Sequence, residues 1–349
     1  MNVVLPAITA LLALLFAVAL LDQWRERRRS FQLVWAIGML FFATASGSEM
    51  LGAVAGWNDT LYRLWYLTGA VCTAAWLGLG TAVLLNRTRF GYAYGALVIL
   101  GGLLAFVARN RYPDAGDIGL LVMIACVVTG LAVAVETYFQ NERWPTIAAI
   151  GVGVGSIAAT VAAFSLPLVG GGFSIGPVTG VPTPDAIPGA ERLISLPMNV
   201  AGGLALVLGA LFSAYVFMPK RRVLDYSLDA GQQGDSFLFN LLIAPVALAV
   251  NFVLSLPTAI RALLTGKIHS RVPATLLIAI GGLIASATDS LARLGSTDLF
   301  QVGKFVGVLL IFVGFVVSVE AFAEIRVPFT GWVLRAGRNE RAGVPTISD

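Results

Sequence analysis

Residues 237–264 read FLFNLLIAPVALAVNFVLSLPTAIRALL, and this stretch decides how many times the chain crosses a membrane. It is long and apolar enough for a helix that spans a bilayer, which needs about 20 apolar residues. However, Pro245 and Pro257 interrupt it, and Asn240 and Asn251 lie inside it. Proline removes a backbone donor and bends or breaks helices, so the pattern predicts a broken hairpin, a re-entrant segment or an interfacial segment, each of which keeps both ends on one face.

Apolar runs of spanning length flank this stretch on both sides. The chain is 58% hydrophobic and 12% charged, with a mean hydropathy of +0.85, values outside the range of soluble proteins. The runs are continuous rather than alternating, which excludes a membrane β-barrel. We therefore expect an all-α, polytopic membrane protein with a bundle of seven helices, the hairpin, and two C-terminal helices. The predicted spans are 3–21, 31–51, 61–85, 91–108, 118–138, 146–168, 197–218, 272–291 and 302–323.

The distribution of basic residues supports the hairpin. If residues 237–264 cross once, we count 12 Lys plus Arg on the cytoplasmic side and 11 outside. If they enter and leave by the same face, the count becomes 17 inside and 6 outside. Cytoplasmic loops are enriched in Lys and Arg, so the second map is favoured. It predicts a multi-pass protein of the inner or plasma membrane, with its N-terminus outside and its C-terminus in the cytoplasm.

The chain divides into four predicted segments. Residues 1–218 form the seven-helix bundle, whose first helix is followed by arginines at 25, 27, 28 and 29, the reverse of the charge order in a cleaved signal peptide. Residues 219–236 form a charged cytoplasmic loop, and 237–324 the hairpin and two-helix unit. Residues 325–349 form a cytoplasmic tail with an aromatic and basic anchor.

Residue types limit the chemistry. Cys72 and Cys126 lie inside apolar runs, and His269 is the single histidine, so neither a Cys/His zinc site nor a bis-histidine haem site is expected. We therefore predict no metal and no cofactor. The net charge of +4 reflects residues that set orientation, so no nucleic-acid partner is expected and the lipid bilayer is the main one.

Four charged residues near the outer helix ends are candidates for ion pairs. Glu49 closes the second run and Arg63 opens the third, so the two are expected to pair across one hairpin. Asp289 and Lys304 stand in the same relation across the last outer hairpin. Ionisable residues within membranes are costly and often functional, but those near helix ends usually form interfacial ion pairs.

A cytoplasmic cluster gives an enzymatic alternative. Asp225 and Asp229 are four residues apart and share a face if their loop is helical, a geometry that suits Mg²⁺. Neighbouring basic side chains suit phosphate, which would make the protein a Mg²⁺-dependent lipid-phosphate enzyme; they are Lys220, Arg221 and Arg222. Charged short loops are more often solvated connectors, so a non-enzymatic role is favoured.

The segment 169–192 carries Gly-Gly-Gly and four prolines, so it should be irregular and lie outside, over the bundle. Long loops in compact proteins are often functional lids. The leading hypothesis is therefore a non-enzymatic, sensor-like or complex-forming module that binds an apolar small molecule, or another membrane protein, beneath this segment. The alternative is a permease for an uncharged or apolar solute, with Pro245, Asn251 and Pro257 as its gate or binding element.

Overall fold

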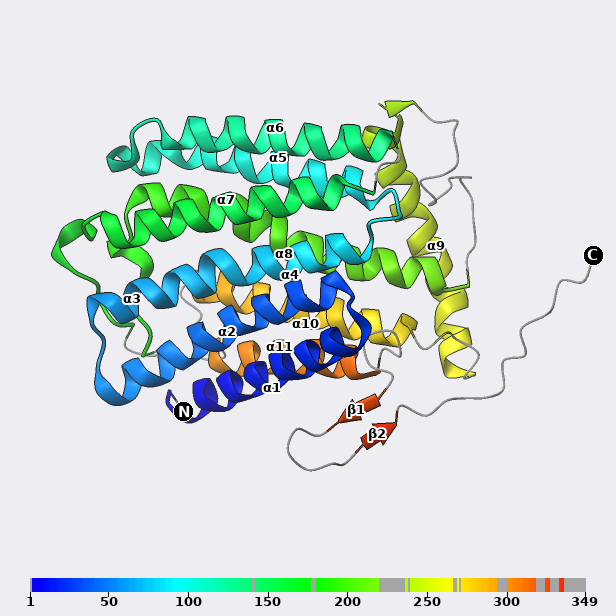
Figure 1. Ribbon diagram of the computed structural model, residues 1–349, viewed down its shortest axis with the longest axis horizontal. Coiled ribbons are helices and arrows are strands. Elements are labelled where there is room, and N and C mark those ends of the chain that lie inside the picture. Colours follow the sequence, from blue (N-terminus) through cyan, green and yellow to red (C-terminus); the bar gives the residue numbers. More distant parts are fainter. Residues whose placement is uncertain are drawn as a thin grey trace, which may run out of the picture.

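The computed structural model is a bundle of long helices (Figure 1). It describes residues 2–139, 142–176, 180–219, 236–237, 239–265, 269, 271–293, 300–317, 324–326 and 333–335. Within these residues, ten helices are long and apolar enough to cross a membrane. The prediction of a polytopic α-helical membrane protein is therefore confirmed.

The helices of the first half are α1 (Val4–Arg27), α2 (Ser30–Ala55), α3 (Asp59–Tyr66), α4 (Ala74–Leu84), α5 (Phe90–Ala108), α6 (Ile118–Tyr138) and α7 (Trp144–Ser165). A π-helical segment, Leu67–Thr73, joins α3 to α4, so the two form one span. The later elements are α8 (Gly189–Phe217), α9 (Ala244–Leu264), α10 (Arg271–Arg293), α11 (Phe300–Val317) and two short antiparallel strands, β1 (Glu324–Arg326) and β2 (Val333–Arg335).

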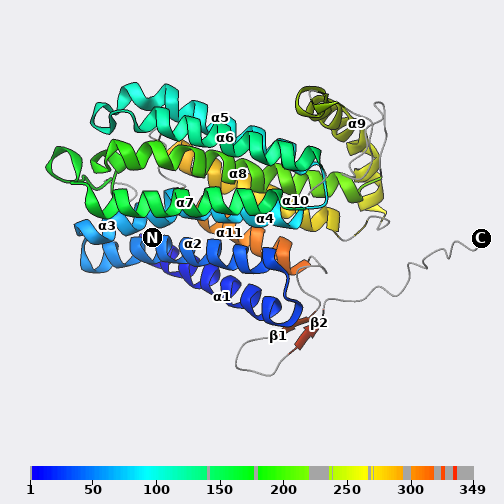
Figure 2. The same cartoon turned by 45° about the horizontal axis from the view of Figure 1, so that its top comes forward.

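Nine of the apolar helical spans described run alongside one another, up and down the bundle (Figures 1 and 2). The chain begins at the end where segment 169–188 folds over, which we call the lid end. Helix α9 instead runs across the opposite end, steeply inclined to the others in both views, and we call this the α9 end. The arginines at the end of α1 and just after it, Arg25, Arg27, Arg28 and Arg29, lie at the α9 end, because α1 starts at the lid end.

Residues 239–264, which the structure describes, form no hairpin. Helix α9 is continuous from Ala244 to Leu264, so that prediction was wrong. Pro245 lies in the first turn of α9. Pro257 lies inside the helix and leaves it unbroken. The five residues before α9, Phe239–Ile243, form a π-helical turn.

Helix α8 also starts earlier than the sequence suggested, at Gly189 rather than at Pro197. Pro197 again lies within a helix, and its backbone packs closely on Gly101 of α5. Prolines are tolerated in membrane helices because neighbouring helices supply the packing and the hydrogen bonds that the ring removes. The additional turns of α8 bring Glu191 and Arg192 into the bundle.

Close helix contacts are made by pairs of glycines. A Cβ on Gly78 of α4 would overlap the backbone of Gly202 of α8. Gly281 and Gly307 bring α10 and α11 together in the same way. Helices in lipid associate largely through such close packing, since lipid tails are as apolar as the side chains.

The two C-terminal spans share the core of the first seven. Phe16 of α1, Trp35 of α2 and Phe315 of α11 belong to one buried cluster, which Ile278 of α10 also joins. The Trp35 and Phe315 ring centroids are 4.4 Å apart. Helices α10 and α11 therefore complete the bundle between α8 and α1.

Candidate functional site

The segment Val169–Pro188, which we call the lid, is folded on itself where it is described. Ile175 forms an isolated antiparallel bridge with Pro182, and the backbone N–H of Gly176 donates to the carbonyl of Val181 at 2.9 Å. The hydroxyls of Ser174 and Thr183 lie 2.8 Å apart. The described residues of the lid therefore form a hydrogen-bonded turn.

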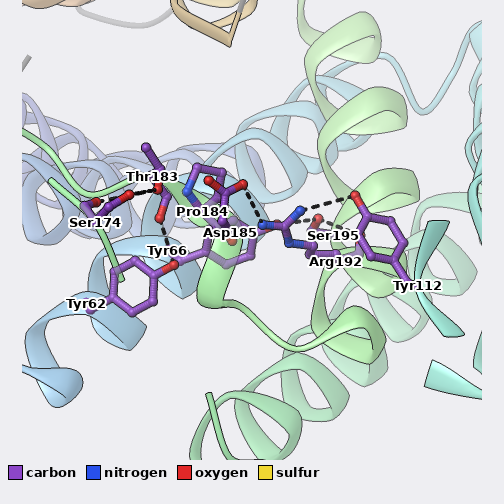
Figure 3. A network of polar contacts seen from close by, with 9 residues as sticks. All are labelled: Tyr62, Tyr66, Tyr112, Ser174, Thr183, Pro184, Asp185, Arg192 and Ser195. Carbon is purple, nitrogen blue, oxygen red and sulfur yellow. Dashed lines mark hydrogen bonds and ion pairs between the residues drawn. The ribbon is translucent and has the colours of Figure 1, made fainter. Parts of the chain in front are cut away.

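Helix α3 and the residues before it hold the lid from one side (Figure 3). The Tyr62 hydroxyl donates to the carbonyl of Thr183 at 2.8 Å, and the Tyr62 ring stacks on Phe173 with centroids 4.4 Å apart. The indole N–H of Trp57 donates to the carbonyl of Gly180 at 3.3 Å. These two aromatic side chains therefore join the lid to α3 and to the connection between α2 and α3.

Helix α8 holds the lid from the other side (Figure 3). The Arg192 guanidinium donates to the carbonyl of Pro184 and to the Tyr112 hydroxyl, the latter at 3.3 Å, and lies 3.5 Å from the Asp185 carboxylate. The Gly189 N–H donates to Asp114 at 2.7 Å. The lid is thus tied to the start of α8 and to the α5–α6 connection.

Glu191 lies in the first turn of α8, directly after the lid in the sequence. Its exposed fraction is 0%, and neither carboxylate oxygen has a hydrogen-bond partner among the residues that the structure describes. A buried carboxylate without a partner is costly, so Glu191 is a candidate functional residue. The helix N-terminus favours negative charge there but supplies no direct bond in this arrangement.

Several polar side chains surround Glu191 at this depth. Arg63 and Cys72 lie close enough to interact with it electrostatically, and one turn along α8 the Ser195 hydroxyl lies 3.1 Å from that of Tyr66. The Nη1 group of Arg63 is already engaged, because it donates to the carbonyls of Ala163 and Leu166 at the end of α7.

The π-helical segment between α3 and α4 borders the same region. Its irregular backbone offers carbonyls to side chains: Asn199 donates to Ala70 at 3.0 Å and Thr73 to Thr68 at 2.7 Å. π-Helical turns within α-helices are frequent at functional sites. The buried Glu191 carboxylate and the π-helical segment therefore lie in the part of the bundle that the start of α8 borders.

No family model, curated protein or solved structure matches this chain. The candidate site therefore depends on the geometry of these residues alone.

The predicted ion pairs are rearranged. Glu49, with an exposed fraction of 2%, pairs with Lys304 of α11 at 2.5 Å instead of with Arg63. It also accepts hydrogen bonds from Trp65 at 2.9 Å and from Gln301 at 3.1 Å. Adjacency in sequence favoured Arg63, but the packing of α11 beside the first hairpin brings Lys304 closer.

Asp289 lies on α10, but the structure does not describe its side chain. Its expected pairing with Lys304 therefore stays a prediction. The cluster of Lys220, Arg221, Arg222, Asp225 and Asp229 lies outside the described residues. The lipid-phosphate hypothesis built on that cluster therefore stays a prediction.

The three gate candidates lie together on α9, away from the lid. Asn251 is buried on the face that packs toward the bundle, and Pro257 is exposed on a different face. They do not converge on one site. The residue that sequence reasoning missed is Glu191, which was assigned to the irregular outer segment. A signal existed: Pro188 followed by Gly-Ala-Glu-Arg places an acidic residue in a first helical turn after proline, a typical helix start.

Proposed function

We propose that this protein is a non-enzymatic membrane module that binds a small molecule beneath the lid, with Glu191 as the group that recognises it. The main support for this proposal is the fully buried Glu191 carboxylate, whose two oxygens lack hydrogen-bond partners among the described residues. A ligand that donates hydrogen bonds would supply the missing partner and remove the cost of burial.

A small amine with an aromatic or apolar body suits this position best. Its ammonium group would pair with the Glu191 carboxylate and form charge-assisted hydrogen bonds, which are stronger than neutral ones. Aromatic side chains near the lid, among them Tyr62, Tyr66 and Phe173, offer ring faces that attract cations and apolar groups. An anionic ligand is disfavoured, because it would repel the carboxylate.

The proposed orientation places the site outside the cell. Counting Lys and Arg favours a cytoplasmic α9 end, and the lid then lies on the outer face. A ligand would reach Glu191 from the medium through movement of the lid. This arrangement suits a sensor or a receptor-like subunit of the inner or plasma membrane.

The permease alternative receives no comparable support. Its gate was a hairpin broken at Pro245 and Pro257, whereas α9 is one continuous helix. The ligand-binding proposal does not depend on that segment.

The test uses three matched probes on the purified full-length protein: benzylamine, benzyl alcohol and benzoate. Benzylamine is expected to raise the melting temperature and to bind in calorimetry, and benzoate to do neither. Glu191→Gln should weaken benzylamine binding by roughly tenfold to a hundredfold, since hydrogen bonds to charged groups contribute about 1.5–3 kcal/mol. Native mass spectrometry after gentle purification would reveal a retained natural amine.

Glu142→Gln is the matched control. Glu142 is an exposed carboxylate at the α9 end, where its ion pair with Arg87 spans 3.2 Å, and its loss should leave benzylamine binding unchanged. The proposal fails if benzylamine binds wild type and Glu191→Gln equally, or if benzoate binds as tightly as benzylamine.

A further inference from the structure

Helix α9 has an apolar side that nothing in the described protein covers. Large exposed side chains recur along it at steps of three, four or seven residues: Val246, Val250, Val253, Ile260 and Leu264. This spacing places them on one face of the helix. We call these residues the α9 stripe.

The opposite face of α9 packs on the protein. Its buried residues are Ala244, Ala247, Asn251, Ser255 and Ala259. Ala259 joins a small core with Tyr215 at the end of α8 and Val272 at the start of α10, and the Phe252 ring lies 6.5 Å from that of Tyr215. Thus α9 is held in place on one side while the stripe faces away.

The position of α9 restricts what can cover the stripe. It runs across the end of a bundle whose other long helices have spanning length, and it is held near the ends of α8 and α10 (Figures 1 and 2). If those helices cross a bilayer, α9 lies in the plane of its surface. Helices with one apolar face and a charged flank bind there, with the apolar face in the acyl boundary.

The charged residues of α9 and of its neighbours in the sequence are all basic. Between Asp235 and Asp289 the sequence contains no Asp or Glu, whereas Arg261, Lys267 and Arg271 are basic. Further basic residues lie at the same end, because α1 ends there, at Arg25, Arg27, Arg28 and Arg29. Basic residues beside a membrane attract anionic headgroups.

We infer that α9 is an in-plane helix that binds the anionic lipid surface of one leaflet, with the α9 stripe in the acyl boundary and the basic residues on the headgroups. A bilayer is the occupant because it is adjacent, apolar at its boundary and oppositely charged at its surface. The inference is independent of the ligand site at the lid end. It also accounts for the basic ends of the molecule gathering on one side without a hairpin.

The first test measures depth in full-length protein reconstituted in vesicles of phosphatidylcholine with phosphatidylglycerol. A spin label is placed at Val253→Cys on the stripe or at Thr258→Cys, an exposed position outside the stripe. The unsubstituted protein, with Cys72 and Cys126, serves as the labelling blank. The label at 253 should collide more often with oxygen than with a polar nickel complex, and the label at 258 should show the reverse.

Two results would overturn the inference. Equal access of the nickel complex at both positions would place the stripe in water, and spin–spin broadening at 253 would show a second copy covering it. A reporter fused to Asp349 gives a third readout. An in-plane α9 predicts the same side of the membrane as a reporter inserted after Arg29, and opposite sides would mean that α9 spans.

The second test addresses lipid charge. Native mass spectrometry should show phosphatidylglycerol retained over phosphatidylcholine, and Arg261→Gln should reduce that preference by about fivefold. Arg111→Gln, at an exposed arginine of the lid end, is the matched control and should leave it unchanged. Equal retention of both lipids by the wild type, or equal effects of the two substitutions, would exclude an anionic surface at α9.

Discussion

Glu49 and Lys304 form a buried ion pair 2.5 Å long between residues 255 positions apart in the chain. The pair joins the end of α2 to the start of α11, so it stabilises the packing of the last described spanning helix against α1 and α2. Trp65 and Gln301 complete the coordination of the carboxylate. Glu49 is therefore a satisfied structural carboxylate, in contrast to Glu191.

Replacing one member of this pair should be strongly destabilising. Lys304→Met leaves Glu49 buried without its cation, and we expect the free energy of unfolding to fall by about 3 kcal/mol. Denaturant unfolding in detergent measures this. The double variant Glu49→Gln with Lys304→Met should recover part of the loss.

The exposed pair of Arg87 and Glu142 provides the control for that prediction, because its side chains are 79% and 59% exposed. Glu142→Gln should change the free energy of unfolding by less than about 1 kcal/mol. Equal effects of Lys304→Met and Glu142→Gln would contradict the importance of the buried pair.

The contact between Gly78 and Gly202 should not tolerate a methyl group. The added Cβ of Gly78→Ala would overlap backbone atoms of Gly202, which cannot move as a side chain can, so α4 and α8 must separate. We expect a loss of about 2 kcal/mol in unfolding experiments. Gly47→Ala in α2 meets open space and should be neutral or stabilising by up to about 1 kcal/mol. A loss as large at Gly47 would show that proximity to Gly202 is not the cause.

The lid should open more often when its bond to α3 is removed. Tyr62→Phe deletes the hydroxyl that donates to Thr183, a contribution of about 1 kcal/mol. Amide hydrogen exchange in peptides covering the lid should accelerate roughly fivefold, as measured by mass spectrometry. Tyr138→Phe, on the exposed side of α6, is the control, and its lid peptides should exchange as in the wild type. Unchanged exchange in Tyr62→Phe would mean that other contacts hold the lid.

The sequence predicted that the apolar runs are membrane-spanning helices, because a bilayer requires a certain length and hydropathy of each run, and both are local properties. The bounds of α6 agree with the prediction at both ends, Ile118 and Tyr138. The proline-containing segments were harder, because the effect of Pro197 and Pro257 depends on which neighbours pack beside them. Prolines therefore led to two wrong predictions, the start of α8 at Pro197 and a break within α9.

The sequence by itself determined the class of protein, the approximate spans and the accumulation of positive charge at the ends of particular helices. Tertiary structure alone decided which charges meet and which remain unpaired: Lys304 rather than Arg63 reaches Glu49, and Glu191 is buried at the start of α8 without a partner among the described residues. The physical reason is that hydropathy acts on each helix separately, whereas pairing across a bundle depends on how helices far apart in the chain pack side by side.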